Sequence, residues 1–223
     1  MLPPLYGVGG TAIGGYEPLP VVQPPYLVEA KDPQCYTLVL DLDETLVHYY
    51  EVNGEGSFRI RPGCEKFLKE MSEMYEVVIF TAAMQDYADW VLDSIDKNRY
   101  ISYRLYRQHA SPTGMVFVKD LSRIGRPLHK TIIVDNVAEN FSLQPDNGIF
   151  IKSWFEDPSD TALHELAPLL KRKFSTPSDG HAFVTGDNLF PLLLTNNNVF
   201  MFTIEIVEKK VKDVREALRK FRD

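Results

Sequence analysis

The stretch Tyr36-Thr-Leu-Val-Leu-Asp41-Leu-Asp43-Glu-Thr45-Leu-Val47 decides the fold of this chain. Its first five residues are apolar or β-forming, which is typical of a buried strand in a parallel sheet. Two aspartates then follow at alternate positions. Carboxylates at the end of a buried strand are costly unless a cation or hydrogen bonds offset their charge. Because ligands of open α/β sheets bind at the carboxyl ends of strands, the stretch predicts a site at Asp41 and Asp43.

The pattern Asp41-x-Asp43-x-Thr45 suggests a carboxylate nucleophile with a second carboxylate beside it. Asp41 could attack a phosphorus atom and carry the phosphoryl group as an aspartyl-phosphate. Asp43 could protonate the leaving oxygen and then activate water for the second step. The same residues are also ordinary at a strand end followed by a turn. Short motifs match by chance, so the pentapeptide alone leaves both interpretations open.

The composition sets broad bounds on the protein. Its 223 residues suit one domain with tails, and 44% hydrophobic content is enough for a core. A net charge of −7 argues against a nucleic-acid partner. Two cysteines make no disulfide framework, and neither a membrane span nor a secretory signal is visible. The default compartment is therefore the cytoplasm or nucleus, with a mitochondrial location left open.

Strand and helix patterns alternate after the first strand, which predicts an α/β fold with a parallel sheet. A β-hairpin or an extended loop is expected within residues 48–61, around Asn53-Gly54, and Trp90 is expected in the core. Pro168 is expected to kink or end the last helix. The other expected strands are residues 75–81, 130–136 and 148–152, and the expected helices are residues 65–74, 84–95 and 157–173.

Both ends of the chain differ from the middle, residues 35–174, which we expect to form the catalytic domain. Residues 1–34 are rich in Pro and Gly, which predicts an extended tail. Their apolar residues would also suit a docking arm for a protein partner. Residues 175–223 form a C-terminal extension that could contain a hairpin and an amphipathic helix. Its part from 199 to 223 could pack on the domain or on a partner.

Reactive or metal-binding groups end three of the expected strands. Because the carboxyl ends of parallel strands meet at one edge of a sheet, these groups are expected to meet there: Asp41 and Asp43, Thr81, and Asp135 with Asn136. Lys119 precedes the last of these strands and could reach the same edge. Its ammonium would neutralise phosphate charge, and the Thr81 hydroxyl would donate to a phosphate oxygen. Carboxylate and amide oxygens at this edge would suit Mg²⁺.

Five motifs in order carry a resemblance to a known family: Asp41-Leu-Asp43-Glu-Thr45, Phe80-Thr81-Ala82-Ala83, Val118-Lys119-Asp120-Leu-Ser-Arg123, Ile133-Val-Asp135-Asn136 and Ser153-Trp154-Phe155-Glu-Asp157. Over residues 36–173 the chain resembles the small C-terminal-domain phosphatases of the haloacid dehalogenase superfamily, also called NLI-interacting-factor-like phosphatases. The resemblance implies a Rossmann-like parallel sheet flanked by helices, with a small β insertion at residues 99–118. Both tails lie outside the resemblance.

The resemblance also implies a function, namely removal of phosphate from phosphoserine or phosphothreonine in proteins, including the tail of RNA polymerase II. It implies a nucleophile at Asp41 and an acid/base at Asp43. It assigns phosphate binding to Thr45, Thr81 and Lys119, and Mg²⁺ binding to Asp41, Asp43 through its carbonyl, and Asn136, with Asp135 nearby.

Two alternatives stay open. The family includes a mitochondrial import receptor subunit whose fold serves binding, so the chain could be a scaffold or assembly subunit that docks through its tails. A small-molecule phosphatase is the weaker alternative, because the sequence shows no large cap domain.

Overall fold

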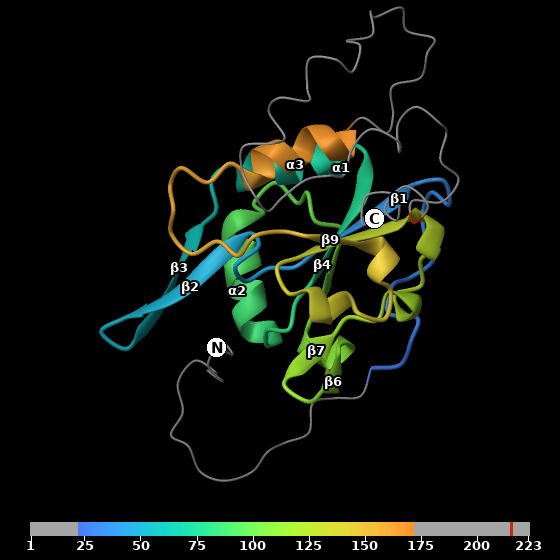
Figure 1. The fold of residues 1–223 in the computed structure, drawn as a ribbon, viewed down its shortest axis with the longest axis horizontal. Coiled ribbons are helices and arrows are strands. Elements are labelled where there is room, and N and C mark those ends of the chain that lie inside the picture. The colour runs from blue at the N-terminus through green and yellow to red at the C-terminus, as the bar shows by residue number, and fades with distance from the viewer. Residues whose placement is uncertain (1–21, 172–214, 216–223) are drawn as a thin grey trace, which may run out of the picture.

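The computed structural model describes residues 22–171 and Arg215 (Figure 1). The predicted hairpin and helix of the C-terminal extension, and most of the predicted N-terminal tail, lie outside the described residues. Within the described part of the chain, no helix has the length and apolar content needed to cross a bilayer.

A five-stranded parallel sheet forms the centre of the fold, in the order β5-β4-β1-β8-β9. Its strands are β1 (Tyr36–Leu40), β4 (Tyr75–Phe80), β5 (Tyr103–Leu105), β8 (Thr131–Asp135) and β9 (Gly148–Phe150). Leu40 of β1 lies opposite Ile79 of β4 and Val134 of β8. The three neighbouring strands therefore end at the same edge, and the predicted parallel α/β fold is confirmed.

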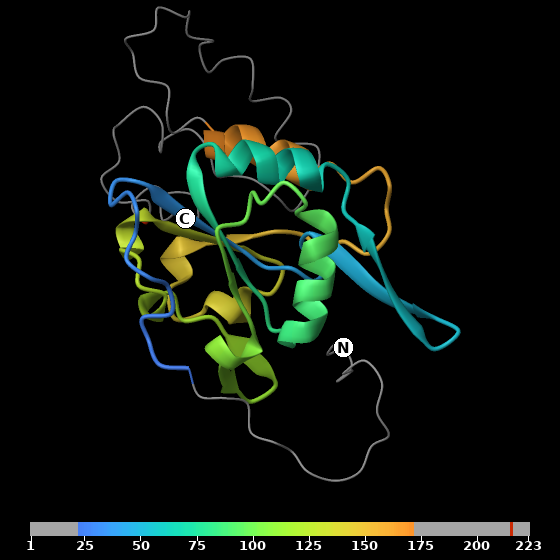
Figure 2. The ribbon, with the colours of Figure 1, turned by 180° about the vertical axis from the view of Figure 1, so that it is seen from behind.

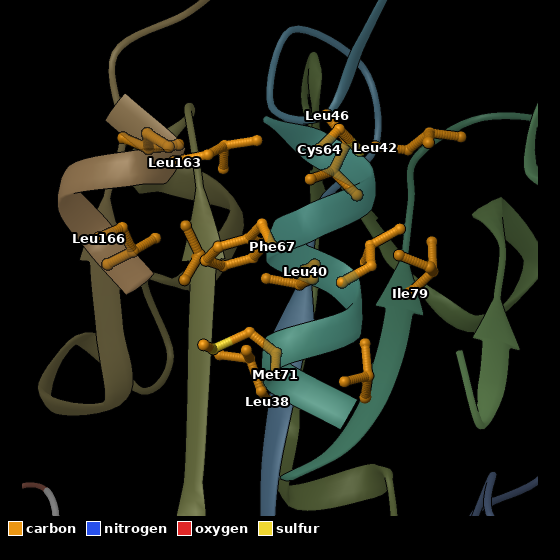
Figure 3. Packing of buried hydrophobic residues seen from close by; sticks show 14 of the residues in the cluster. Leu38, Leu40, Leu42, Leu46, Cys64, Phe67, Met71, Ile79, Leu163 and Leu166 are labelled. Carbon is orange, nitrogen blue, oxygen red and sulfur yellow. The ribbon is translucent and has the colours of Figure 1, made fainter. Parts of the chain in front are cut away.

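The two faces of the sheet are covered differently. The helices α1 (Cys64–Ser72), α2 (Gln85–Ile95) and α3 (Ala162–Lys171) cover one face, where Phe67 and Met71 pack against Leu38 and Leu40 (Figure 3). Because side chains alternate along a strand, Val39 points to the other face and its separate core. Short 3₁₀ helices cover that second face or connect the strands: η1 (Arg107–His109), η2 (Leu121–Arg123), η3 (Leu128–Lys130), η4 (Ala138–Phe141) and η5 (Pro145–Asn147).

Two antiparallel hairpins extend from the sheet. The first joins β2 (Val47–Val52) to β3 (Glu55–Ile60) and projects beside α2 in both views (Figures 1 and 2). Its turn residues Asn53 and Gly54 both have positive φ, as a tight two-residue hairpin requires, so the predicted hairpin is confirmed. The second joins β6 (Ser111–Thr113) to β7 (Val116–Val118).

Three sequence predictions need correction. The β insertion is shorter than residues 99–118, because β5 pairs with β4 as an edge strand of the central sheet. The last helix starts at Ala162 rather than 157, because Asp157 closes a turn onto Ser159. It also does not end at Pro168 but continues through it to Lys171, while the alternative, a kink at Pro168, stays a prediction.

The prediction that Trp90 lies in the core is wrong. Its side chain is 44% exposed, because α2 buries the stripe formed by Ala88, Val91 and Leu92. Position 90 lies off that stripe, and the indole instead meets the Phe58 ring of the hairpin edge-on at 5.0 Å.

The described part of the N-terminal segment, residues 22–34, lies on its own domain; we call it the N-terminal strap. The backbone N–H groups of Tyr26 and Leu27 donate to the carbonyls of Arg123 and Ile124, both at 3.1 Å. The Leu27 side chain is buried in the second core. The strap therefore packs on the C-terminal end of η2, a short helix that begins two residues after Lys119.

Removing the Leu27 side chain tests whether the strap is part of the domain. We expect Leu27→Ala to lower the free energy of unfolding by about 2–4 kcal/mol, as for other buried leucines. The matched control is Val28→Ala, one residue later and 68% exposed, which should change it by less than about 0.5 kcal/mol. Denaturant titration measures both, and a loss for Leu27→Ala as small as that for Val28→Ala would contradict the assignment of Leu27 to the core.

Candidate active site

Backbone hydrogen bonds hold the three predicted strand ends in place. The Asp41 N–H donates to the Val134 carbonyl at 3.0 Å, and the Thr81 N–H donates to the Leu105 carbonyl at 2.9 Å. Each bond extends the sheet one residue past a strand. Asp41 and Thr81 therefore follow β1 and β4 directly, at the edge where Asp135 ends β8.

Lys119 lies between two carboxylates of this edge. Its Nζ is 2.5 Å from Asp41 Oδ1 and 2.6 Å from Asp135 Oδ2, and the side chain is fully buried. Burial alone would lower the pKa of this ammonium, but Asp135 and Asp41 outweigh it, so the pKa is raised. Lys119 is therefore a fixed positive charge beside Asp41.

Asp135 holds Lys119 and is itself held by its neighbours. Its Oδ1 accepts from the Val137 N–H at 2.8 Å and from Asn140 Nδ2 at 3.0 Å. Sequence reasoning missed Asn140, because a single Asn in a loop gives no signal. With Lys119 on Oδ2, both oxygens of Asp135 already have protein partners, so this side chain positions the lysine.

Thr45 links Asp41 to Asn136. Its hydroxyl is 3.2 Å from Asp41 Oδ2 and 3.4 Å from Asn136 Oδ1. Asn136 is oriented by Ser153, whose Oγ accepts from Nδ2 at 3.0 Å. Two oxygens thus lie next to the Thr45 hydroxyl, namely Asp41 Oδ2, which Lys119 does not bind, and Asn136 Oδ1.

This pair of oxygens fits the ligand preference of Mg²⁺, which binds few protein oxygens and keeps several waters. Among the described residues there is no group of three or more His, Cys, Asp and Glu side chains that could hold a metal. Asp41 Oδ2 and the Asn136 amide oxygen are both chemically able to bind a cation, whereas both oxygens of Asp135 already accept hydrogen bonds from protein groups.

Asp43 lies in a different environment from Asp41. Its Oδ1 accepts a 2.5 Å hydrogen bond from the Tyr87 hydroxyl of α2. Burial raises the pKa of Asp43 to about 6, against the opposing effect of the Tyr87 hydrogen bond. Burial also raises the pKa of Asp41, where the charge of Lys119 opposes it. A carboxyl group with a raised pKa can carry a proton, as a general acid must.

Thr81 presents a hydroxyl group to the same edge. Its Oγ1 accepts from the Ala83 N–H at 3.0 Å, which orients the side chain. The Thr81 hydroxyl also opposes the effect of burial on Asp43 and lowers the pKa of that carboxyl group.

Arg61 supports the loop that carries Asp41 and Asp43, and no sequence motif pointed to this residue. Its guanidinium binds Asp160 at 2.7 and 2.9 Å and donates to the carbonyls of Thr45 and Lys152. Trp154 donates its backbone N–H to the Glu44 carbonyl at 2.8 Å. The 153–157 motif is thus fastened to the loop that carries Asp41 and Asp43.

Arg61→Met should be strongly destabilising. It leaves Asp160 without its cation and removes the donors to two carbonyls, so we expect a loss of about 3–5 kcal/mol in the free energy of unfolding. Arg59→Met is the matched control, because Arg59 pairs with Glu156 on the surface and should cost about 0–1 kcal/mol. Thermal and denaturant unfolding give both values; a loss for Arg61→Met no larger than for Arg59→Met would contradict the assignment.

Comparison with known families identifies the domain. The family model described as "NLI interacting factor-like phosphatase" matches residues 36–180. The chain therefore belongs to the NLI interacting factor-like phosphatase family.

Named relatives agree with this assignment. The chain is 45% identical over 150 residues to "Probable C-terminal domain small phosphatase" of Dictyostelium discoideum, covering 60% of this chain and 49% of that protein. It is 38% identical over 161 residues to "Carboxy-terminal domain RNA polymerase II polypeptide A small phosphatase 1" of Homo sapiens, covering 65% and 61%. The chain thus spans about half the length of the first of these relatives.

A solved structure with similarity to the chain is "The Structure of Fcp1, an essential RNA polymerase II CTD phosphatase". Its TM-score is 0.47 at 17% identity, over 84% of this chain and 62% of that one.

Proposed function

We propose that this chain is a Mg²⁺-dependent protein serine/threonine phosphatase that forms an aspartyl-phosphate on Asp41. The observation that carries the proposal is the fully buried Lys119 between Asp41 and Asp135. Burying three charges is expensive and seldom stabilises a fold by itself. A cation held beside a carboxylate at the ligand-binding edge of the sheet is suited to receiving a phosphate.

In the first step, a carboxylate oxygen of Asp41 forms a bond to phosphorus, and the bond from phosphorus to the serine or threonine oxygen breaks. Asp43 gives its proton to that leaving oxygen. Lys119 and Thr81 bind the other phosphoryl oxygens, whose charge grows in the transition state.

In the second step, a water oxygen bonds to phosphorus and the bond from phosphorus to Asp41 breaks, which releases inorganic phosphate. Asp43, now a carboxylate, takes the proton of that water and is ready for the next cycle. When bound, Mg²⁺ neutralises phosphate charge, and Asp41, Asn136 and the backbone carbonyl of Asp43 would hold it.

We also propose that the substrate is a phosphorylated protein segment. Names of similar proteins refer to the carboxy-terminal domain of an RNA polymerase II polypeptide. Among residues 22–171, the excursions from the sheet are two small hairpins, and no cap domain covers the site. A peptide has access to such an edge. The cytoplasm or nucleus is the proposed location.

Removal of the metal tests the enzymatic proposal. Turnover of a phosphoserine peptide should require Mg²⁺, fall at least about 100-fold in EDTA because the phosphate charge is no longer neutralised, and return with excess Mg²⁺. Phosphate release measures it, with 4-nitrophenyl phosphate as a second substrate. A folded chain that hydrolyses neither substrate in Mg²⁺ would contradict the proposal and favour the scaffold alternative.

A further inference from the structure

Tyr87 contacts the proposed acid/base, although no sequence motif pointed to it. Its hydroxyl donates to Asp43 Oδ1 at 2.5 Å. Tyr87 therefore already binds one oxygen of the Asp43 carboxyl group, and in the proposed mechanism the other oxygen, Oδ2, carries the transferable proton.

The ring of Tyr87 is held by two different elements. Tyr49 of the β2–β3 hairpin meets it edge-on, with ring centroids 5.4 Å apart. Trp90, three residues further along α2, lies 6.2 Å from it and is itself packed against Phe58 of the hairpin. The edge-to-face contact with Tyr49 and the tilted contact with Trp90 favour one ring orientation, so the position of the hydroxyl is set by both the helix and the hairpin.

We infer that Tyr87 is a positioning residue for proton transfer: by binding Oδ1 it holds the Asp43 carboxyl group so that Oδ2 faces the leaving oxygen. Tyr87 keeps its own proton throughout, and the proton that moves is the one on Asp43 Oδ2. The inference rests on the proposed phosphatase function and assigns a residue beyond the family motifs quoted above.

The effect of losing Tyr87 on the rate should depend on the leaving group of the substrate. The terminal torsion of an aspartate is broad, so without Tyr87 the carboxyl group can turn away from the leaving oxygen. A serine alkoxide is a strong base, and its bond to phosphorus breaks slowly unless the oxygen is protonated. 4-Nitrophenolate is a weak base and leaves without that proton. Loss of Tyr87 should therefore affect the two substrates unequally.

The first experiment compares Tyr87→Phe with the wild type on both substrates. Phe keeps the ring contacts and removes only the hydroxyl. We expect kcat/KM, which reports formation of the aspartyl-phosphate and not its hydrolysis, to fall at least about tenfold for a phosphoserine peptide and less than about threefold for 4-nitrophenyl phosphate, because general acid catalysis matters only for the first. Tyr106→Phe is the matched control: its hydroxyl donates to Asp89 of the same helix at 2.8 Å, so its loss should leave the ratio of the two rates unchanged.

A double-mutant cycle with Asp43→Asn separates positioning from general structural damage. If Tyr87 acts through Asp43, Tyr87→Phe should cause no further loss of 4-nitrophenyl phosphate or peptide turnover in the Asp43→Asn background. Equal losses on both substrates in the single variant, a change confined to KM, or additive losses in the cycle would each overturn the inference. A wild type that hydrolyses neither substrate would instead overturn the phosphatase function, and the Tyr87 role with it.

Discussion

Asp41→Asn should remove phosphatase activity while leaving the protein folded. We expect kcat for a phosphoserine peptide to fall by at least about 10³-fold, the scale seen when a nucleophile is removed. An amide is nearly the same size as a carboxylate but is a poor nucleophile, so no aspartyl-phosphate can form. The fold should persist because Lys119 keeps its second partner, Asp135.

The measurement is peptide turnover in Mg²⁺ together with a thermal melt. Asp93→Asn serves as a control, since Asp93 is a surface carboxylate of α2 paired with Arg104. It should keep wild-type turnover. If Asp41→Asn is folded and keeps more than about a tenth of wild-type kcat, Asp41 is not the nucleophile.

Lys119→Met should have the second large effect, on stability as well as activity. Methionine fills much of the space of lysine but leaves Asp41 and Asp135 buried without their common cation. Breaking a buried ion pair from one side costs about 3–5 kcal/mol, because the remaining charge is uncompensated. Activity should fall too, since the phosphate loses its fixed positive charge.

Lys66→Met, at an exposed position of α1, is the control for replacing a lysine by methionine. It should change the free energy of unfolding by less than about 0.5 kcal/mol. Denaturant unfolding of both variants makes the comparison. A Lys119→Met protein as stable as Lys66→Met would mean that the buried lysine does not hold the two carboxylates.

The site's main contacts could be predicted because they follow from sheet geometry. Asp41, Thr81 and Asp135 each end a strand, and parallel strands end at a common edge. Once β1 is paired with β4 and β8, these three residues must lie close together, so no other long-range contact has to be known. Lys119 lies outside a strand, and its place at this edge was expected mainly from its position in the motif order.

The supporting contacts could not be predicted, because they join residues far apart in sequence without a local pattern. Arg61 and Asp160 are 99 positions apart, and Tyr87 and Asp43 are 44 apart. The error at Trp90 has a similar origin. Helical spacing marks an apolar stripe, but the neighbouring hairpin decides whether an aromatic ring beside that stripe is buried.

The N-terminal strap shows that a domain boundary, too, cannot be predicted from local composition alone. The family model begins at residue 36, and Pro- and Gly-rich composition predicts an extended tail up to residue 34. Extended backbone is nevertheless able to pair and pack, as Leu27 does in the second core. A boundary drawn from composition alone would remove a residue that the core contains. The predicted boundaries of the tails otherwise remain predictions.

Trapping the covalent intermediate tests directly whether Asp41 is the nucleophile that carries the phosphoryl group. The full chain would be mixed with a phosphoserine peptide and Mg²⁺, quenched in acid during turnover, digested and mapped by mass spectrometry. We predict one phosphoryl group on the fragment that contains Asp41, and we expect the mapping to place it on Asp41 itself. The Asp41→Asn variant should carry no phosphoryl group. Turnover with no phosphoryl group on the protein, or with the group on another residue, would contradict it.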